Sequence, residues 1–477
     1  MTVVIVGAGP VGVTAALLLA RQGVPSILLE RHDDIYPLPR AVAVDDEVQR
    51  ILQAAGVAGA FAAISRPSRG LRLVDARHRV IAEFARSSVG VHGFPQTSMF
   101  DQPALERVLR DELARRPLCE LRSGVEVVAV REGSVTYLKD GVATTIEADA
   151  VLGCDGANSL TRQAIGASWH DFGFAEEWTV VDVRTDAAVR SWDGVDQVCD
   201  PRQPATFMRI GEDRYRWEFR RSAGIDDSQL RALVAPWVRP APDEKFEVVR
   251  KARYTFRARV ADRWRRGRVF LLGDAAHQTP PFVGQGLCAG LRDAANLSWK
   301  LALVVRGADE RLLDTYEAER SPHVRRVIRI AVAAGWAMTG GQDRAASLRH
   351  KATAALCRMP GVPGLLNRER GVARGPLSRG TTCPQPRVGG RPLDDLLGVS
   401  FAVVAREPTP GVRAIAAALG APIVQADELD EWLRRERVDA VLIRPDRTVV
   451  DVVPAGASEF TGVAGWARLV TGRTACP

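Results

Sequence analysis

The stretch that decides the fold is Val3-Val4-Ile5-Val6-Gly7-Ala8-Gly9-Pro10-Val11-Gly12, near the start of the 477-residue chain. Its β-branched run is typical of a parallel strand that is covered on both faces, and a helical apolar pattern follows the glycines. A second short apolar run, at residues 27–29, is followed by the acidic residue Glu30. The order of strand, glycine turn, helix, strand and acid predicts a βαβ unit that binds a dinucleotide, rather than glycines that only permit close packing.

Each part of this motif has a physical task. Gly7 allows a tight turn, Gly9 lets a pyrophosphate approach the backbone, and Gly12 lets the helix pack closely against the strand. The N-terminus of the helix attracts the anion, and the acid accepts hydrogen bonds from ribose hydroxyls. The motif alone does not distinguish NAD from FAD. The residues of this segment that we expect to contact the cofactor are Gly7, Gly9, Pro10, Val11, Gly12, Glu30 and Arg31.

Two later motifs favour FAD. Residues 151–156 read as a buried strand that ends in an Asp-Gly turn, and residues 268–286 read as a second strand followed by an Asp, a Pro pair and a glycine-rich turn. Ligands of open α/β sheets bind at the carboxyl ends of the strands, so Gly9, Asp155 and Asp274 are expected to converge on one long cofactor. An NAD domain would close within about 150 residues.

The composition, with 46% hydrophobic and 26% charged residues, excludes disordered and fibrous classes. The net charge of +8 is local, because residues 321–391 contain thirteen Arg or Lys and two acids. Aromatic residues are only 6% and show no spacing suited to base stacking. We therefore expect a solvated or partner-facing basic surface and no nucleic-acid binding.

The seven Cys residues form no Cys-x-x-Cys pair and are accompanied by no His cluster. This indicates neither a disulfide framework nor a metal site, and it favours a reducing cytoplasm. Residues 3–20 carry no charge, but the glycines among them and the absence of a basic start argue against a signal peptide or membrane span. We expect a cytoplasmic protein without membrane contact.

The three motifs resemble the FAD fingerprint, the Asp-Gly motif and the Gly-Asp motif of the class A flavoprotein aromatic hydroxylases, which include para-hydroxybenzoate hydroxylase and phenol hydroxylase. The resemblance is strongest to the 3-(3-hydroxyphenyl)propionate hydroxylase branch and covers nearly the whole chain. Further stretches that carry it are residues 39–47, 178–183, 290–301, 313–320 and 443–446.

The resemblance implies an α/β fold with four segments. Residues 1–170 form the first part of a Rossmann-like FAD-binding domain, and residues 171–265 form an inserted β-sheet domain that binds the substrate. Residues 266–380 return to the FAD-binding domain with long interface helices. Residues 381–477 resemble the thioredoxin-like domain appended to these enzymes, here without Cys-x-x-Cys and therefore without expected thiol chemistry.

The resemblance also assigns roles to single residues. Arg40 would meet the pyrophosphate and Gln102 the ribityl chain, although without the family these are a solvated loop charge and a helix-start residue. Pro281, with Pro280, would form a rigid wall beside the flavin C4a atom. Relatives often carry Asn where this chain has Cys288, so a backbone contact survives but an amide contact does not. The further flavin contacts are Asp155, Asp274, Gly284, Gly286 and Leu287.

The implied reaction begins when NADH or NADPH reduces the bound FAD and O₂ adds to give a C4a-hydroperoxide, which a phenol attacks. The chain has one dinucleotide fingerprint, so the nicotinamide co-substrate would bind transiently. A flavin oxidase or dehydrogenase on the same fold is the alternative, and a flavin-binding scaffold with residues 321–391 as a partner surface is a third reading. The expected partners are a small phenolic substrate and O₂, and a homodimer is compatible with the sequence.

The catalytic base is open at this level. Asp45 matches a carboxylate that phenol hydroxylases place near the substrate oxygen, and it is also a suitable N-cap for the helix predicted at residues 46–55. His277, beside Asp274, is interpreted as structural. Tyr215 and Trp217 are candidates for substrate binding, with core packing as the default reading of Trp217.

Overall fold

A computed structural model describes residues 2–36, 41–220, 224–239, 244–339 and 377–471. A six-stranded sheet in the order β18-β19-β12-β1-β2-β8 forms the core of the first domain, and all its strand pairs are parallel except β18 with β19. Its strands are β1 (Val3–Val6), β2 (Ser26–Leu29), β8 (Cys119–Arg122), β12 (Ala150–Gly153), β18 (Arg265–Arg266) and β19 (Val269–Leu271).

The helices of this domain pack around the strands that the apolar runs predicted. The fingerprint helix α1 contacts α4 and α7, so the uncharged segment near the start of the chain is buried. Within the described ranges, none of the helices combines the length and the apolarity that crossing a membrane requires. The helices are α1 (Pro10–Arg21), α2 (Asp46–Ala54), α3 (Ala58–Ile64), α4 (Gln102–Ala114), α5 (Leu160–Ala164), α7 (Gly286–Val305) and α8 (Asp314–Thr339).

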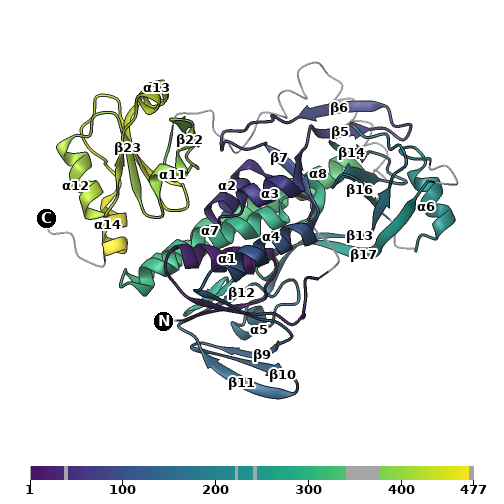
Figure 1. Cartoon of the computed structure of the whole chain (residues 1–477), viewed down its shortest axis with the longest axis horizontal. Helices are drawn as coiled ribbons and strands as arrows, with labels where there is room; N and C mark the ends of the chain where they lie inside the picture. The colour runs from purple at the N-terminus through teal and green to yellow at the C-terminus, as the bar shows by residue number, and fades with distance from the viewer. Residues whose placement is uncertain (1, 37–40, 221–223, 240–243, 340–376, 472–477) are drawn as a thin grey trace.

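An antiparallel meander forms a three-stranded sheet, which Figure 1 shows at the lower end of the molecule. A second three-stranded sheet, in the order β3-β7-β4, carries Asp45 at the end of its first strand. These strands are β9 (Glu126–Arg131), β10 (Ser134–Lys139), β11 (Val142–Glu147), β3 (Ala43–Asp45), β4 (Ser65–Pro67) and β7 (Thr97–Phe100).

The predicted substrate segment forms most of an eight-stranded sheet in the order β20-β17-β13-β16-β15-β14-β5-β6. The sheet is not confined to residues 171–265, because β5 pairs in parallel with β14 and brings β6 with it. The pairing satisfies backbone groups that a free edge at β14 would leave without partners. The strands are β5 (Gly70–Val74), β6 (Val80–Ala85), β13 (Trp169–Thr185), β14 (Val195–Val198), β15 (Ala205–Arg209), β16 (Arg214–Arg220), β17 (Phe246–Ala261) and β20 (His277–Gln278).

The last part of the chain folds into a separate α/β unit, which lies at the opposite end of the molecule from the eight-stranded sheet (Figure 1). Its four-stranded sheet has the order β24-β23-β25-β26. Its assignment as thioredoxin-like stays a prediction. The elements are β21 (Arg387–Val388), β22 (Arg391–Pro392), α11 (Asp394–Leu397), β23 (Ala402–Ala405), α12 (Pro410–Ala418), β24 (Ile423–Val424), α13 (Asp427–Glu436), β25 (Val438–Ile443), β26 (Val449–Pro454) and α14 (Ala464–Thr471).

A buried charge network docks this C-terminal unit on the long helices. Arg444, after β25, donates to both carboxylate oxygens of Glu319 on α8, at 2.8 and 2.9 Å. Lys300 on α7 donates to the same carboxylate at 3.0 Å. Burial would raise the pKa of Asp446, but the adjacent Arg444 lowers it to about 2. The stretch 443–446, which carried part of the resemblance, thus holds the two units together.

We predict that Arg444→Met loosens this junction. Removing one partner of a buried ion pair leaves the other charges uncompensated, which costs about 3 kcal/mol or more. The variant should unfold at a lower temperature and lose its C-terminal unit faster to a protease. Arg413→Met, on the exposed side of α12, removes the same charge away from the junction and is the control. Equal unfolding temperatures in the two variants would show that the network does not hold the unit.

Candidate active site

The strand register brings the three motif turns to one edge of the sheet. Val6 pairs with Gly153, and Gly153 pairs with Leu271, in parallel ladders. The turns that follow β1, β12 and β19 therefore leave the sheet side by side. These turns contain Gly7, Asp155 and Asp274, so the expected convergence is present in the structure.

The glycines of the fingerprint divide into two kinds. A Cβ atom on Gly7 would lie 2.5 Å from the carbonyl oxygen of Cys154, and one on Gly12 would lie 2.1 Å from that of Gly7. These two glycines are required by packing. A Cβ on Gly9 would meet no atom within 4 Å, and no side chain caps the N-terminus of α1. The space in front of the helix is therefore open to an anion.

Val11 and Glu30 support this edge from inside the protein. Val11 lies between Gly273 and Gly290, and a Cβ on Gly290 would approach its Cγ2 atom to 2.7 Å. The buried Glu30 accepts hydrogen bonds from the backbone N–H groups of Ala8 at 2.8 Å and His32 at 3.0 Å. Both residues fix the fingerprint turn.

Two predicted cofactor residues differ in their surroundings. Arg31 is exposed, and its Nε atom lies 3.2 Å from Nε2 of His32. Asp155 accepts two hydrogen bonds from Thr161 through Oδ2, at 2.9 and 3.0 Å. Its Oδ1 atom is buried and has no partner among the described residues. The Oδ1 atom of Asp155 is therefore suited to accept from a polar ligand group at this edge of the sheet. Among the described residues, no contact directs the Arg31 side chain toward the same edge.

The Gly-Asp turn is held by a carboxylate that the sequence reasoning did not single out. Asp293 is fully buried on α7 and accepts a hydrogen bond from the backbone N–H of Gly273 at 3.1 Å. Its two oxygens also lie 2.7 Å from His277 Nε2 and 2.8 Å from Arg320 Nε. Burial would raise the pKa of Asp293, but His277 and Arg320 outweigh it and hold the pKa below its ordinary value. The structural interpretation of His277 is confirmed.

The Pro pair and the glycine turn lie at the start of α7. Pro281 begins a short 3-10 helix (Pro281–Val283), and the next residue, Gly284, caps it with a φ of 64°, in the left-handed region. Cβ atoms on Gly284 and Gly286 would meet no atom within 4 Å. Leu287 follows in the first turn of α7, so the segment offers an open helix N-terminus beside a rigid wall.

Asp45 is an N-cap, as expected, and it also belongs to an ion network. Its Oδ1 atom accepts from the backbone N–H of Val48 at 2.9 Å. Its Oδ2 atom accepts from Gln285 Nε2 at 3.0 Å and from Arg292 Nη2 at 2.7 Å. Arg292 also donates to Glu47 at 2.7 Å. The network links the Asp45 strand directly to the glycine turn before α7.

Of the remaining positions singled out in the sequence, the structure describes Gln102 and Cys288 but not Arg40. Gln102 begins α4 and accepts from the backbone N–H of Ala41 at 2.7 Å, so it holds the chain next to Arg40. Arg40 itself lies outside the described residues. Cys288 is buried, with its Sγ atom 3.9 Å from the carbonyl oxygen of Ala43, and burial raises the pKa of its thiol.

The assignment of Tyr215 and Trp217 to the substrate is not supported. Both side chains lie in a buried cluster with Phe207 and Trp237, on the face of the sheet that packs against α6 (Asp227–Val234). Strand alternation sends the intervening Arg216 to the opposite face. The sequence showed the alternation, but it did not show which face the cofactor domain covers.

That opposite face is directed toward the cofactor domain. Met208, the neighbour of Arg216 across the ladder, packs with Met99 and Ala43. Arg216 donates to the fully buried Asp182 at 2.7 Å. Glu218, next but one, is also buried, and burial raises its pKa above the ordinary value. Arg216, Asp182 and Glu218 therefore form a buried polar cluster on the face of the sheet that is directed toward the Asp45 strand.

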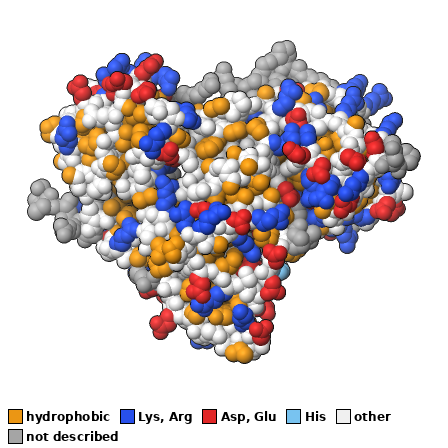
Figure 2. Space-filling view, viewed as in Figure 1, with side chains coloured by type: hydrophobic (Ala, Val, Ile, Leu, Met, Phe, Trp, Pro, Cys, Tyr) orange, Lys and Arg blue, Asp and Glu red, His pale blue; other side chains and the backbone are white. Residues whose placement is uncertain are grey.

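Phe282, in the turn after the Pro pair, connects these two sides. Its ring contacts Trp178 and Phe174 of β13, each with a centroid distance of 5.8 Å. This aromatic contact holds the turn after the Pro pair against the eight-stranded sheet. On the face in Figure 2, basic and acidic side chains are interspersed over the molecule. Most of the basic segment 321–391 lies outside the described residues.

Comparisons with known proteins agree with this geometry. The sequence model of the family described as "FAD binding domain" matches residues 1–331. A probable NADH-specific resorcinol 4-hydroxylase of Rhodococcus jostii (strain RHA1) is 34% identical, covering 97% of this chain and 93% of the relative. A 3-(3-hydroxy-phenyl)propionate/3-hydroxycinnamic acid hydroxylase of Burkholderia vietnamiensis is also 34% identical, covering 97% and 95%.

Solved structures give the same result for the fold. A ternary complex of aklavinone-11 hydroxylase with FAD and aklavinone superposes with a TM-score of 0.80 at 25% identity, covering 99% of both chains. The anhydrotetracycline hydroxylase OxyS from Streptomyces rimosus gives a TM-score of 0.78 at 25% identity, covering 99% of this chain and 100% of that one. Both span the C-terminal unit as well as the cofactor domain.

We predict that Gly9→Val folds but does not retain FAD. The backbone at Gly9 is extended and a Cβ there meets no protein atom, so the fold tolerates the side chain. The valine occupies the space that a pyrophosphate needs, and the purified protein should be colourless. The visible flavin absorbance of the purified protein measures its FAD content. Gly465→Val, at an exposed position of α14, is the control, and full FAD occupancy in Gly9→Val would refute this role of the loop.

Proposed function

The chain belongs to the FAD binding domain family, and from this membership we propose that it is an FAD-dependent monooxygenase that hydroxylates a phenolic ring with NADH and O₂. The observation that carries the proposal is the common edge of β1, β12 and β19, with its open glycine turn at Gly9. Two relatives at 34% identity are named hydroxylases of phenolic compounds, and one of them is named NADH-specific. These names support the substrate class and the choice of NADH.

The residues of the edge fit FAD. The N-terminus of α1 would receive the pyrophosphate, and the buried Oδ1 atom of Asp155 and the Asp274 turn would receive hydroxyl groups. The N-terminus of α7, from Gly284 to Leu287, would receive the pyrimidine edge of the flavin beside Pro281. Bound FAD, when reduced, supplies the electrons that activate O₂.

The chain itself positions the ring and excludes water. We place the phenol between the Pro281 turn and the face of the eight-stranded sheet that carries Arg216 and Glu218. The contact between Phe282 and Trp178 closes one side of this space with apolar rings. The buried pair of Arg216 and Asp182 offers both donors and acceptors to polar ring substituents in a region shielded from solvent.

The proton acceptor for the phenol is proposed to be Asp45. Its Oδ2 atom lies at the glycine turn but already accepts from Gln285 and Arg292. Glu218 on the facing sheet is the competing candidate, because it is buried and burial raises its pKa, which makes the carboxylate a stronger proton acceptor. The two residues stand on opposite sides of the proposed ring position, so substitution can separate them.

Oxygen insertion is tested by product analysis. The FAD-loaded protein is screened with NADH, NADPH and a series of phenols that includes resorcinol and 3-(3-hydroxyphenyl)propionate. We expect substrate-dependent oxidation of NADH and a product that gains one oxygen atom from ¹⁸O₂. A flavin oxidase or dehydrogenase, the alternative on the same fold, would give an unlabelled dehydrogenated product and would overturn the proposal.

We predict that Asp45→Asn separates capping from base catalysis. Asn keeps an acceptor for the Val48 N–H, so α2 should lose little stability. It cannot take a proton, so oxygen transfer should slow by about 10²-fold while NADH oxidation continues and more H₂O₂ is released. Alkaline pH, at which the phenol ionises unaided, should restore the product yield.

Glu218→Gln is the matched variant on the facing wall. If Asp45 is the base, Glu218→Gln should keep most of its hydroxylated product per NADH at neutral pH. Loss of product in Glu218→Gln together with unchanged product in Asp45→Asn would assign the base to the sheet and leave Asp45 as a cap and a partner of Arg292.

A further inference from the structure

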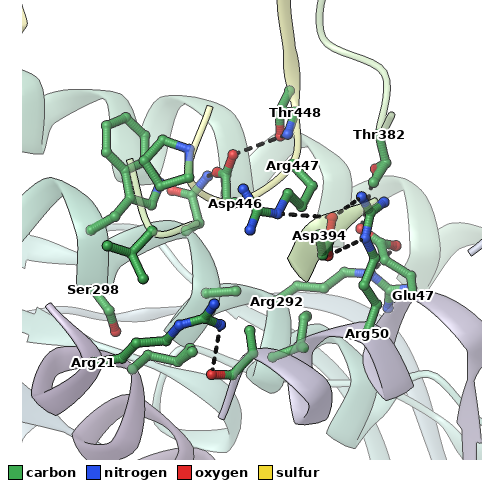
Figure 3. Close-up of a pocket in the computed structure, with 18 of the residues that line it drawn as sticks. Arg21, Glu47, Arg50, Arg292, Ser298, Thr382, Asp394, Asp446, Arg447 and Thr448 are labelled. Carbon is green, nitrogen blue, oxygen red and sulfur yellow. Dashed lines mark hydrogen bonds and ion pairs between the residues drawn. The ribbon is translucent and has the colours of Figure 1, made fainter. Parts of the chain in front are cut away.

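A cavity lies at the junction of the cofactor domain and the C-terminal unit, and the glycine turns of the cofactor domain are not part of its wall. It has a volume of about 120 Å³, and we call it the junction cavity. Its walls come from α1, α2, α7, α8, the segments around α11 and the turn between β25 and β26. Figure 3 shows Arg447 reaching into it from the C-terminal unit and Arg21 lying on the side of the cofactor domain. The proposed function does not use this space.

Positive charge exceeds negative charge around the junction cavity. Asp394 accepts from Arg50 at 2.6 and 2.7 Å and from Arg447 at 3.1 Å, so two guanidinium groups share one carboxylate. Arg21 forms no ion pair with any described residue and donates to the carbonyl oxygen of Ala54 at 2.9 Å. Three guanidinium groups thus surround one acid, which leaves a surplus of two positive charges.

The other charges of the wall do not change this surplus. Arg292 is paired with Asp45 and Glu47, Arg320 with Asp293, and Asp446 with Arg444. Asp395 lies near Arg21 but is exposed to solvent, and the nearby Arg116 opposes its effect.

The guanidinium groups are also crowded and incompletely satisfied. Burial lowers the pKa of Arg447, and repulsion from Arg50 and Arg21 lowers it further. The Nη1 atom of Arg447, which is 6% exposed as a residue, has no acceptor among the described residues. An unmatched buried donor of this kind costs free energy that an anion would recover.

We propose that the junction cavity binds a free tetrahedral oxyanion of the phosphate class through Arg21, Arg50 and Arg447. A dianion matches the surplus of two positive charges, and guanidinium groups suit the oxygens of phosphate. A cavity of about 150 Å³ accepts benzene, so the present volume suits a small ion and excludes a nucleotide. The exposed Arg21 and Val399 stand on its rim and leave an entry from solvent.

Such an ion would join the two units. Arg21 and Arg50 belong to α1 and α2 of the cofactor domain, whereas Arg447 and Asp394 belong to the C-terminal unit. Binding to the docked arrangement alone stabilises it by mass action. The inference does not depend on the hydroxylase proposal, because it concerns the fold and can be tested without substrate.

The test measures thermal unfolding of the FAD-loaded full-length protein against sodium phosphate. Bound FAD occupies the anion site at α1, so that site does not contribute. Chloride at equal ionic strength controls for screening, and millimolar concentrations keep the general salting effect of phosphate small. We expect a saturable rise of the unfolding temperature with phosphate, and sulfate should act in the same way.

Arg21→Gln is the decisive variant, because Arg21 is exposed and has no carboxylate partner to leave uncompensated. It should raise the phosphate concentration for half-maximal stabilisation about tenfold or more. Arg447→Gln should abolish the response, and Arg413→Gln on the surface of α12 should keep it. An unfolding temperature independent of phosphate, or equal responses in Arg21→Gln and Arg413→Gln, would overturn the proposal.

Discussion

The buried carboxylate of Asp293 is the constraint on which the active-site architecture depends. A fully buried charge is stable only when charged and hydrogen-bonding partners surround it. Its partners come from distant parts of the chain: the Gly273 N–H and His277 follow β19, and Arg320 stands on α8. Satisfying one carboxylate therefore fixes the Gly-Asp turn, α7 and α8 relative to one another, and this places the N-terminus of α7 at the cofactor edge.

The preceding residue, Arg292, performs a second task from another side of the same helix. It binds Asp45 and Glu47 at the start of α2, and it also donates to Gln285 in the glycine turn. Glu47 in turn accepts from Thr382 in the C-terminal segment at 3.2 Å. Two adjacent residues of α7 thus hold the Gly-Asp turn and the glycine turn before α7, and they connect both to the C-terminal unit.

Local sequence patterns predicted the cofactor sheet but not the contacts between distant segments. The run at residues 3–6, the glycine spacing and the short strands before Asp155 and Asp274 gave the cofactor sheet, because buried parallel strands have a distinctive composition. The joining of β5 to β14 was missed, since edge pairing depends on a distant partner. The pairing of Asp45 with Arg292, across 247 residues, has no local signal, and alternation in β16 does not reveal which face the cofactor domain covers.

The junction of the C-terminal unit combines apolar packing with charge, and the two have different effects. Trp299 packs against Phe401 and Trp466 with centroid distances of 5.5 and 6.3 Å, and this burial favours association without fixing one orientation. Partly buried ion pairs such as Arg444 with Glu319 add little net stability after desolvation, but a shifted arrangement would leave their charges unpaired. The charges therefore select one docked orientation. Where guanidinium groups outnumber carboxylates, that selection is incomplete until an anion supplies the missing charge.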